Sequence, residues 1–111
     1  MVYEAGVKHV GRLFVLYLYP GDDLARAVVA SRKVGNAVRR NRAKRLLREA
    51  LRQRIERVPG RAAALRRRYW PDTPEPPTLW LVAVARTRIV DAGCADVVAE
   101  LDGMLQRPST S

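Results

Sequence analysis

Hydrophobic residues dominate two short runs near the start of the chain, Arg12 to Tyr19 and Arg26 to Ser31. Both runs are rich in β-branched and aromatic residues, and the turn-forming sequence PGDD at 20–23 separates them, so we expect an antiparallel hairpin. Side chains point to alternate faces of a strand. One face of the first strand therefore carries Leu13, Val15, Tyr17 and Tyr19, the other carries Phe14, Leu16 and Leu18, and one face must pack against helices.

The next segment has helical periodicity. Asn36 is a good N-cap for a helix that runs to about Val58, where Pro59 and Gly60 end it. At about 100° per residue, one stripe of this helix contains Ala43, Leu47, Ala50, Leu51 and Val58, and the opposite side contains Arg42, Arg45 and Arg52. We expect the helix to pack on its apolar stripe and to expose positive charge on the other side.

The second half of the chain predicts a strand and a helix after a Pro-rich segment. Five of the seven prolines fall within residues 59–78, which we interpret as an inserted loop, with helical turns over Arg61 to Tyr69. Leu79 to Ala85 is almost entirely apolar, as expected for a central strand. Asp91 is a candidate cap for a last helix whose apolar side carries Cys94, Val97, Val98, Leu101, Met104 and Leu105. The order strand, strand, helix, strand, helix predicts one α+β domain over residues 1–111, a small sheet packed with helices.

The positive charge of the chain is concentrated in one segment. The chain has 21 basic and 11 acidic side chains, and residues 32–54 hold ten of the basic ones with a single acid, Glu49. This segment thus carries +9 of the net +10. A solvated helix face usually mixes signs, because like charges four residues apart destabilise a helix. The concentration therefore favours a surface that binds nucleic acid over a charge run that only solubilises the helix.

The residue types needed for catalysis by the protein alone are scarce. His9 and Cys94 are the only histidine and cysteine, so neither a zinc site nor a Cys-His pair can be assembled, and we expect Cys94 to be a small core residue. Asp96 and Glu100, spaced like neighbours on a helix, are best explained as a solvated face.

No apolar run approaches the roughly 18 residues of a membrane span. Together with the absence of a secretory pattern, this leads us to expect a cytoplasmic protein.

Tyr17 and Tyr19, on one face of the first strand, admit two interpretations: core aromatics with wet hydroxyls, or a platform on which unpaired bases stack. From the residues alone, the core interpretation is favoured.

The string SRKVGNAVRRNRAKRLLREALR at 31–52, with Arg40-Asn41-Arg42 at its centre, closely resembles the signature of the bacterial ribonuclease P protein subunit. The resemblance extends through both predicted strands before it and through LWLVAVARTRIVDAG after the loop, and covers roughly 90 of the 111 residues. It implies an α+β sandwich like the second domain of ribosomal protein S5, with a left-handed βαβ crossover against the usual rule. It also implies a non-catalytic role in an endonuclease: the protein joins a catalytic RNA that, with bound Mg²⁺, removes the 5′ leader from precursor tRNA.

The resemblance assigns two RNA-binding regions to this chain. It implies no membrane and no obligate protein partner. The catalytic RNA would contact the basic segment at Arg32, Lys33, Asn36, Arg39, Arg40, Asn41, Arg42, Lys44, Arg45 and Arg48. The single-stranded leader of precursor tRNA would lie in a cleft between the sheet and an amino-terminal helix, at Tyr3, Tyr17, Ser31 and Arg86, which favours the stacking interpretation of Tyr17.

Two departures from the family pattern matter. The family's first helix normally begins upstream of the position of Tyr3 with a basic stretch and an Asp-Phe pair. This sequence starts at Met1, just short of that pair, so one aromatic residue of the cleft is missing and weaker leader binding is expected. The segment 59–78 is longer than usual, and its Arg66, Arg67, Arg68, Tyr69 and Trp70 are either extra RNA contacts or part of a loop with no fixed role. Two rivals stay open: a general RNA-binding or ribosomal-type protein with no role in tRNA cleavage, and a protein nuclease in its own right.

Overall fold

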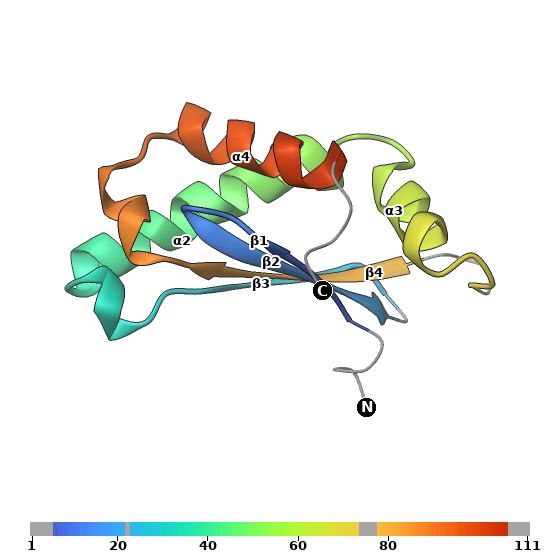
Figure 1. The fold of residues 1–111 in the computed structure, drawn as a ribbon, viewed down its shortest axis with the longest axis horizontal. Coiled ribbons are helices and arrows are strands. Elements are labelled where there is room, and N and C mark those ends of the chain that lie inside the picture. The colour runs from blue at the N-terminus through green and yellow to red at the C-terminus, as the bar shows by residue number, and fades with distance from the viewer. Residues whose placement is uncertain (1–5, 22, 74–77, 107–111) are drawn as a thin grey trace.

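Four strands form a single mixed sheet in the computed structural model, which describes residues 6–21, 23–73 and 78–106. They are β1 (Val7–Val10), β2 (Phe14–Gly21), β3 (Ala25–Val29) and β4 (Thr78–Ala85), arranged β1-β2-β4-β3 (Figure 1). β4 is antiparallel to β2 and parallel to β3. The predicted hairpin of β2 with β3 is therefore wrong, because the apolar β4 lies between them and pairs with both. Strand β1, which pairs antiparallel with β2, was not predicted.

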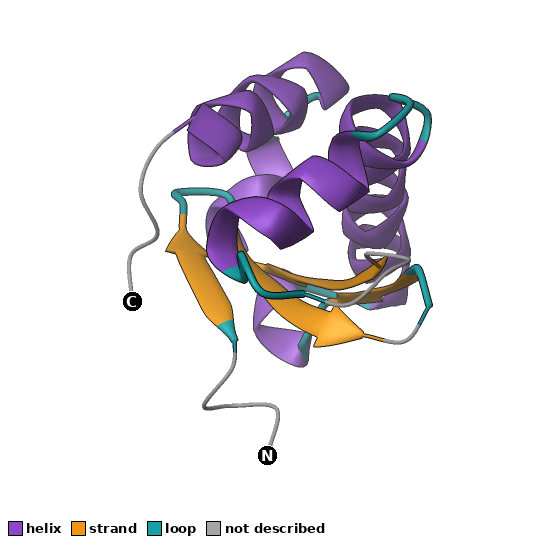
Figure 2. Cartoon of the chain, turned by 90° about the vertical axis from the view of Figure 1, so that its right-hand side faces the viewer, coloured by secondary structure: helices purple, strands orange, loops and turns teal. Residues whose placement is uncertain are grey.

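The helices lie on one side of this sheet (Figures 1 and 2). They are α2 (Ala37–Leu51), continued by the π-helical turn η2 (Arg52–Glu56), then α3 (Arg61–Tyr69) and α4 (Cys94–Gln106). Two short 3-10 helices, η1 (Arg32–Val34) and η3 (Thr87–Asp91), follow β3 and β4. The parallel strands β3 and β4 are thus connected through α2 and α3. The left hand of this crossover remains an expectation from the resemblance.

The core lies between the sheet and the helices. From the sheet it takes Phe14, Leu16, Leu18, Leu79, Leu81, Ala83 and Ala85. From α2 and η2 it takes Ala43, Leu47, Ala50, Leu51 and Ile55, and from α4 it takes Val97, Val98, Leu101, Met104 and Leu105. The predicted stripes are confirmed apart from their ends: Val58 is only half-buried and Ile55 is buried instead, while Cys94 is exposed. The core prediction for Cys94 is wrong, because it is the first residue of α4 and the apolar stripe begins at Val97.

Caps fix where α2 begins. The side-chain oxygen Oδ1 of Asn36 accepts a hydrogen bond from the backbone N–H of Arg39 at 3.0 Å, as predicted for an N-cap. Gly35, between η1 and α2, has φ of 142°, in the region that a Cβ atom disfavours. Gly35 therefore allows the sharp change of chain direction between η1 and α2.

Two carboxylates of α4, those of Asp96 and Glu100, accept hydrogen bonds from backbone N–H groups. Asp91 lies in η3 and does not cap α4; instead Asp96 Oδ2 accepts from the backbone N–H of Gly93 at 2.8 Å. The Glu100 carboxylate accepts from the backbone N–H groups of Arg12, Leu13 and Phe14 at 2.9, 2.9 and 3.2 Å. The interpretation as a solvated face agrees with the exposure of Asp96 but is wrong for Glu100, whose carboxylate binds the backbone. Glu100 ties the connection between β1 and β2 to α4.

The helix predicted inside the Pro-rich segment is confirmed as α3, and its polar side chains hold it against the rest of the fold. Arg66 is buried, and its Nη1 donates to the carbonyl oxygens of Gly21, at 3.0 Å, and Thr78. Arg68 Nη1 donates to the carbonyl of Leu105 at 2.8 Å. His9 Nε2 and the Tyr69 hydroxyl are 3.1 Å apart. Arg66 is therefore a structural residue, inaccessible to RNA.

Candidate nucleic-acid interface

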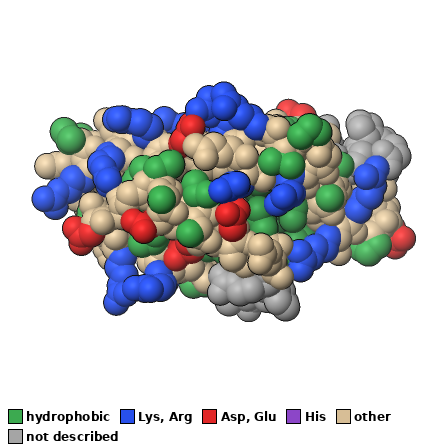
Figure 3. Space-filling view, turned by 90° about the horizontal axis from the view of Figure 1, so that it is seen from above, with side chains coloured by type: hydrophobic (Ala, Val, Ile, Leu, Met, Phe, Trp, Pro, Cys, Tyr) green, Lys and Arg blue, Asp and Glu red, His purple; other side chains and the backbone are tan. Residues whose placement is uncertain are grey.

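The basic surface consists of η1 and the first three turns of α2. Arg32, Lys33, Asn36, Arg39, Asn41, Arg42, Arg45 and Arg48 are exposed, and Arg40 and Lys44 are half-buried. Seen from the helix side, Lys and Arg lie along one edge and at one end of the molecule, and others are scattered over the middle of this face among Asp and Glu (Figure 3). Because no acid lies in the first turn of α2, the positive end of the helix dipole adds to the charges of Arg39 and Arg40. This end of α2 therefore favours an anionic partner.

Two residues of the basic surface are also used within the fold. Asn36 caps α2, as described above. The guanidinium of Arg42 donates to the carbonyl oxygens of Val90 at 3.4 Å and Ala92 at 2.6 Å. Arg42 thus fastens η3 and the start of α4 to α2. By contrast, Arg45 and Arg48 form no side-chain hydrogen bond or ion pair with any residue that the structure describes.

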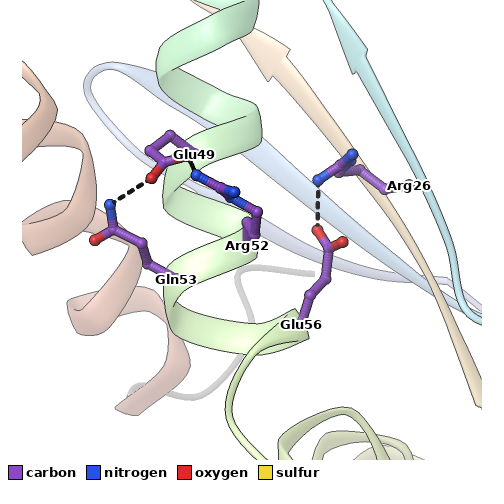
Figure 4. A network of polar contacts seen from close by, with 5 residues as sticks. All are labelled: Arg26, Glu49, Arg52, Gln53 and Glu56. Atoms are coloured by element: carbon purple, nitrogen blue, oxygen red, sulfur yellow. Dashed lines mark hydrogen bonds and ion pairs between the residues drawn. The ribbon is translucent and has the colours of Figure 1, made fainter.

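The positive charge is offset at the other end of the helix (Figure 4). Glu49 accepts hydrogen bonds from Gln53 Nε2, at 2.9 Å, and from Arg52, while Glu56 pairs with Arg26 at 2.7 Å. The hydrogen bonds from Gln53 and then Arg52 hold the pKa of Glu49 below its ordinary value of 4.5. This neutralising network begins at Glu49, directly after Arg48, the last of the predicted RNA-binding residues.

No described helix covers the opposite face of the sheet, which we call the open face (Figure 2). Cross-strand partners place the following residues on it: Lys8, Val10, Val15, Tyr17, Tyr19, Ala25, Ala27, Val29, Trp80, Val82 and Val84. Val10 and Val29 are 36% and 45% exposed. An apolar sheet face of this kind is unusual unless something binds to it.

Three aromatic side chains stand together on the open face. Tyr17 lies between Lys8 and Val82 in the register, and Tyr19 lies beside Trp80. The rings of Tyr17 and Tyr19 are within 6° of parallel, with centroids 6.4 Å apart. Parallel aromatic rings of this kind offer faces on which unpaired bases can stack. The core interpretation of the tyrosines is wrong, because both are half-buried on the side away from the helices.

The remaining predicted leader-binding residues lie at one end of the sheet. Val29 and Val84 are the last partners in the pairing of β3 with β4, and Ser31 and Arg86 each follow two residues later. The Ser31 hydroxyl accepts from the backbone N–H of Lys33 at 3.3 Å, and Arg86 Nη1 donates to the carbonyl of Gly11 at 2.7 Å. The structure therefore brings Ser31 and Arg86 to the edge where the open face meets η1. Tyr3 lies outside the described residues.

Sequence reasoning missed two arginines near this edge, Arg12 and Arg88. They are exposed and lie, together with Arg86, around one small pocket. Arg12 stands far from the others in sequence and outside the charged segment, so only the tertiary fold could have revealed the grouping.

Within residues 6–21, 23–73 and 78–106, no group of three or more His, Cys, Asp or Glu side chains is placed to hold a metal ion. None of the helices described here is long and apolar enough to cross a membrane.

Comparison with known proteins identifies relatives along almost the entire chain. The family model described as Ribonuclease P matches residues 1–109. The ribonuclease P protein of Staphylococcus aureus superposes with a TM-score of 0.65 at 23% identity, covering 95% of this chain and 83% of that one. The ribonuclease P protein of Thermotoga maritima gives a TM-score of 0.64 at 23% identity, covering 96% and 86%. At this identity the two structures establish the shared fold alone.

Curated relatives match shorter stretches of the sequence at higher identity. A "Ribonuclease P protein component" of Nitratiruptor sp. is 43% identical over 58 residues, 52% of this chain and 53% of the relative. Another, of Dehalococcoides mccartyi, is 47% identical over 53 residues, 46% of this chain and 44% of the relative. The matched segment thus spans about half the length of these curated relatives.

Proposed function

Because the chain belongs to the Ribonuclease P family, we propose that it is the protein subunit of a ribonucleoprotein that removes the 5′ leader from precursor tRNA. In this proposal the catalytic RNA binds the basic surface, and the single-stranded leader lies on the open face. The observation that carries the proposal is that the two surfaces meet at one end of the sheet, where β3 leads through η1 into α2. One RNA assembly can thereby contact both. This role places the protein in the cytoplasm with its two RNAs.

The basic surface would act by neutralising phosphates. Each Lys or Arg that contacts a phosphate releases condensed counterions, and Arg can also bind phosphate with two parallel hydrogen bonds. Eight cationic side chains belong to the predicted surface, and its Asn41 can hydrogen-bond to backbone or base edges. Neutralisation of this kind lowers the repulsion between the catalytic RNA and precursor tRNA.

The open face would grip the leader through its bases. Unpaired bases stack on aromatic rings whatever their identity, and Tyr17, Tyr19 and Trp80 provide rings in neighbouring register positions. Lys8, opposite Tyr17, adds positive charge for the leader backbone. A platform of this kind distinguishes precursor tRNA from mature tRNA, which has no leader.

The hydrolytic step is assigned to the RNA in this proposal. Mg²⁺ held mainly by the RNA would supply activated water and stabilise the leaving oxygen. The residues of this chain bind and orient the two RNAs. Of its carboxylates, Asp96, Glu100, Glu49 and Glu56 are engaged with backbone or with partners in the fold.

The proposal is tested by cleavage of a precursor tRNA at low Mg²⁺ with a bacterial ribonuclease P RNA, with and without this chain. We expect cleavage to depend on the protein, and Arg45→Ala to weaken the stimulation. Arg45 is preferable to Arg42, whose replacement also releases η3. Arg61→Ala, in α3 and outside the basic surface, is the control.

The rival functions give different results in the same assay. Tight RNA binding without stimulation would indicate a general RNA-binding protein. Cleavage by the purified chain without the RNA subunit would indicate a protein nuclease.

A further inference from the structure

A pocket of about 210 Å³ opens between the β1–β2 connection and the start of η3, lined by Arg12, Arg86, Thr87 and Arg88. Three of its four lining residues are arginines. It has room for a phosphate group and several water molecules, each of which occupies about 30 Å³. A wider groove beside it is lined by the same arginines and by Asp91, Asp96 and Glu100.

The arginines of this pocket form no ion pair with Asp91, Asp96 or Glu100, the described carboxylates that line the neighbouring groove. Glu100 is engaged by three backbone N–H groups and Asp96 by the N–H of Gly93. The side chains of Arg12 and Arg88 form no hydrogen bond or ion pair with any described residue. Like charges held around one pocket repel each other, and a bound anion removes that repulsion.

One of the three guanidinium groups is already fixed in place. Arg86 Nη1 donates to the carbonyl of Gly11 at 2.7 Å, and the backbone N–H of Arg86 donates to the carbonyl of Leu13 at 2.8 Å. The connection that carries Arg12 is held in turn by Glu100. Arg12 and Arg86 therefore lie on backbone that hydrogen bonds already hold in place, which reduces the conformational entropy lost when a ligand binds.

We propose that Arg12, Arg86 and Arg88 form a phosphate-binding site, with Thr87 as a further donor. Guanidinium groups bind phosphate oxygens through paired hydrogen bonds, and a hydroxyl can complete the set. The site extends the interface predicted from sequence, since η3 packs against η1, which carries Arg32 and Lys33. It lies where β2 begins and β4 ends, at the same end of the sheet as η1, so an RNA strand bound along η1 can reach it.

The phosphate has two possible sources, an RNA backbone or a free phosphoanion. The identification of the backbone rests on the proposed function, whereas the existence of the site does not.

The test compares Arg12→Gln and Arg88→Gln with Arg61→Gln as a matched control. Both pocket side chains are exposed and unpaired within the described residues, so their replacement leaves the fold intact, which urea unfolding verifies. In one arm, sodium pyrophosphate is titrated at constant ionic strength while NMR follows the backbone N–H signals of Gly11 and Thr87. In the other arm, single-stranded RNA oligonucleotides carry one neutral methylphosphonate linkage, moved along the strand.

We expect saturable shifts with pyrophosphate for the wild-type chain and a five- to tenfold weaker affinity for either pocket variant. If RNA is the source, one methylphosphonate position weakens binding to the wild-type chain and has no effect on Arg88→Gln. Loss of pyrophosphate binding with unchanged RNA binding assigns the site to a free phosphoanion. Affinities of both pocket variants equal to those of Arg61→Gln in both arms overturn the site. Because neither arm contains the catalytic RNA, failure of the proposed function in the cleavage assay is a separate result.

Discussion

At the scale of single residues, Glu100 joins parts of the chain that are distant in sequence. Its carboxylate accepts from the backbone N–H groups of Arg12, Leu13 and Phe14. Hydrogen bonds to a charged group are stronger than neutral ones, and their loss leaves donors unpaired. We predict that Glu100→Ala lowers the free energy of unfolding by about 2 kcal/mol, measured by urea denaturation. Asp91 is exposed and lines the same surface groove as Glu100. Asp91→Ala should therefore change the free energy of unfolding by less than about 0.5 kcal/mol. Equal stability of the two variants would contradict this role.

Tyr17 carries the residue-scale prediction for function. Its ring lies nearly parallel to that of Tyr19 on the open face, and removal of a base-stacking ring costs about 1–3 kcal/mol per base. We predict that Tyr17→Ala weakens binding of precursor tRNA by about ten- to a hundredfold and spares mature tRNA, with both affinities measured for the assembled ribonucleoprotein. Tyr17→Phe, which keeps the ring, should restore most of the affinity. An equal loss for both forms of tRNA would refute the leader assignment.

At the scale of elements, the sequence predicted individual helices and strands better than their pairing. The capped helix at Asn36 and the apolar strand β4 follow from local signals, and both are confirmed. The hairpin failed because a turn sequence between two strand-like runs cannot reveal that a third strand, nearly 50 residues later in the chain, separates them. Strand β1 is only four residues long and contains Lys8 and His9, so its pattern is weak.

The candidate site shows the same division. The basic surface was predictable because its residues lie close together in sequence, in η1 and α2, and the structure leaves most of them exposed. The structural roles of Arg42 and Arg66 were not predictable, because a guanidinium that binds a backbone carbonyl has the same sequence signature as one that binds phosphate. Only the fold brings Arg12 beside Arg86 and Arg88.

The element α3 depends on Arg66. This buried side chain connects the helix to the carbonyl oxygens of Gly21 and Thr78 at the ends of β2 and β4. We predict that Arg66→Ala lowers the free energy of unfolding by about 2 kcal/mol and leaves RNA affinity unchanged at a temperature where the variant is folded. Urea denaturation and RNA titration measure the two effects. An RNA affinity lowered by more than the Arg61→Ala control would instead make Arg66 an RNA contact.

At the scale of the whole molecule, the basic charge is segregated, and this sets the salt dependence of RNA binding. The first three turns of α2 are rich in cations, whereas Glu49 and Glu56 offset Arg52 and Arg26 towards its end. For single-stranded RNA, each neutralised phosphate contributes about 0.7 to the slope of log affinity against log salt concentration. We predict that the triple replacement of Arg39, Arg45 and Arg48 by Ala reduces this slope by about 2.

The same replacement at Arg57, Arg61 and Arg67 removes an equal charge at the other end of the helical layer, and should reduce the slope by less than about 0.7. If both triple variants lower the slope equally, net charge rather than its placement governs binding, and the basic surface has no privileged role. If only the first does, the RNA lies along η1 and α2, next to the edge where the open face begins.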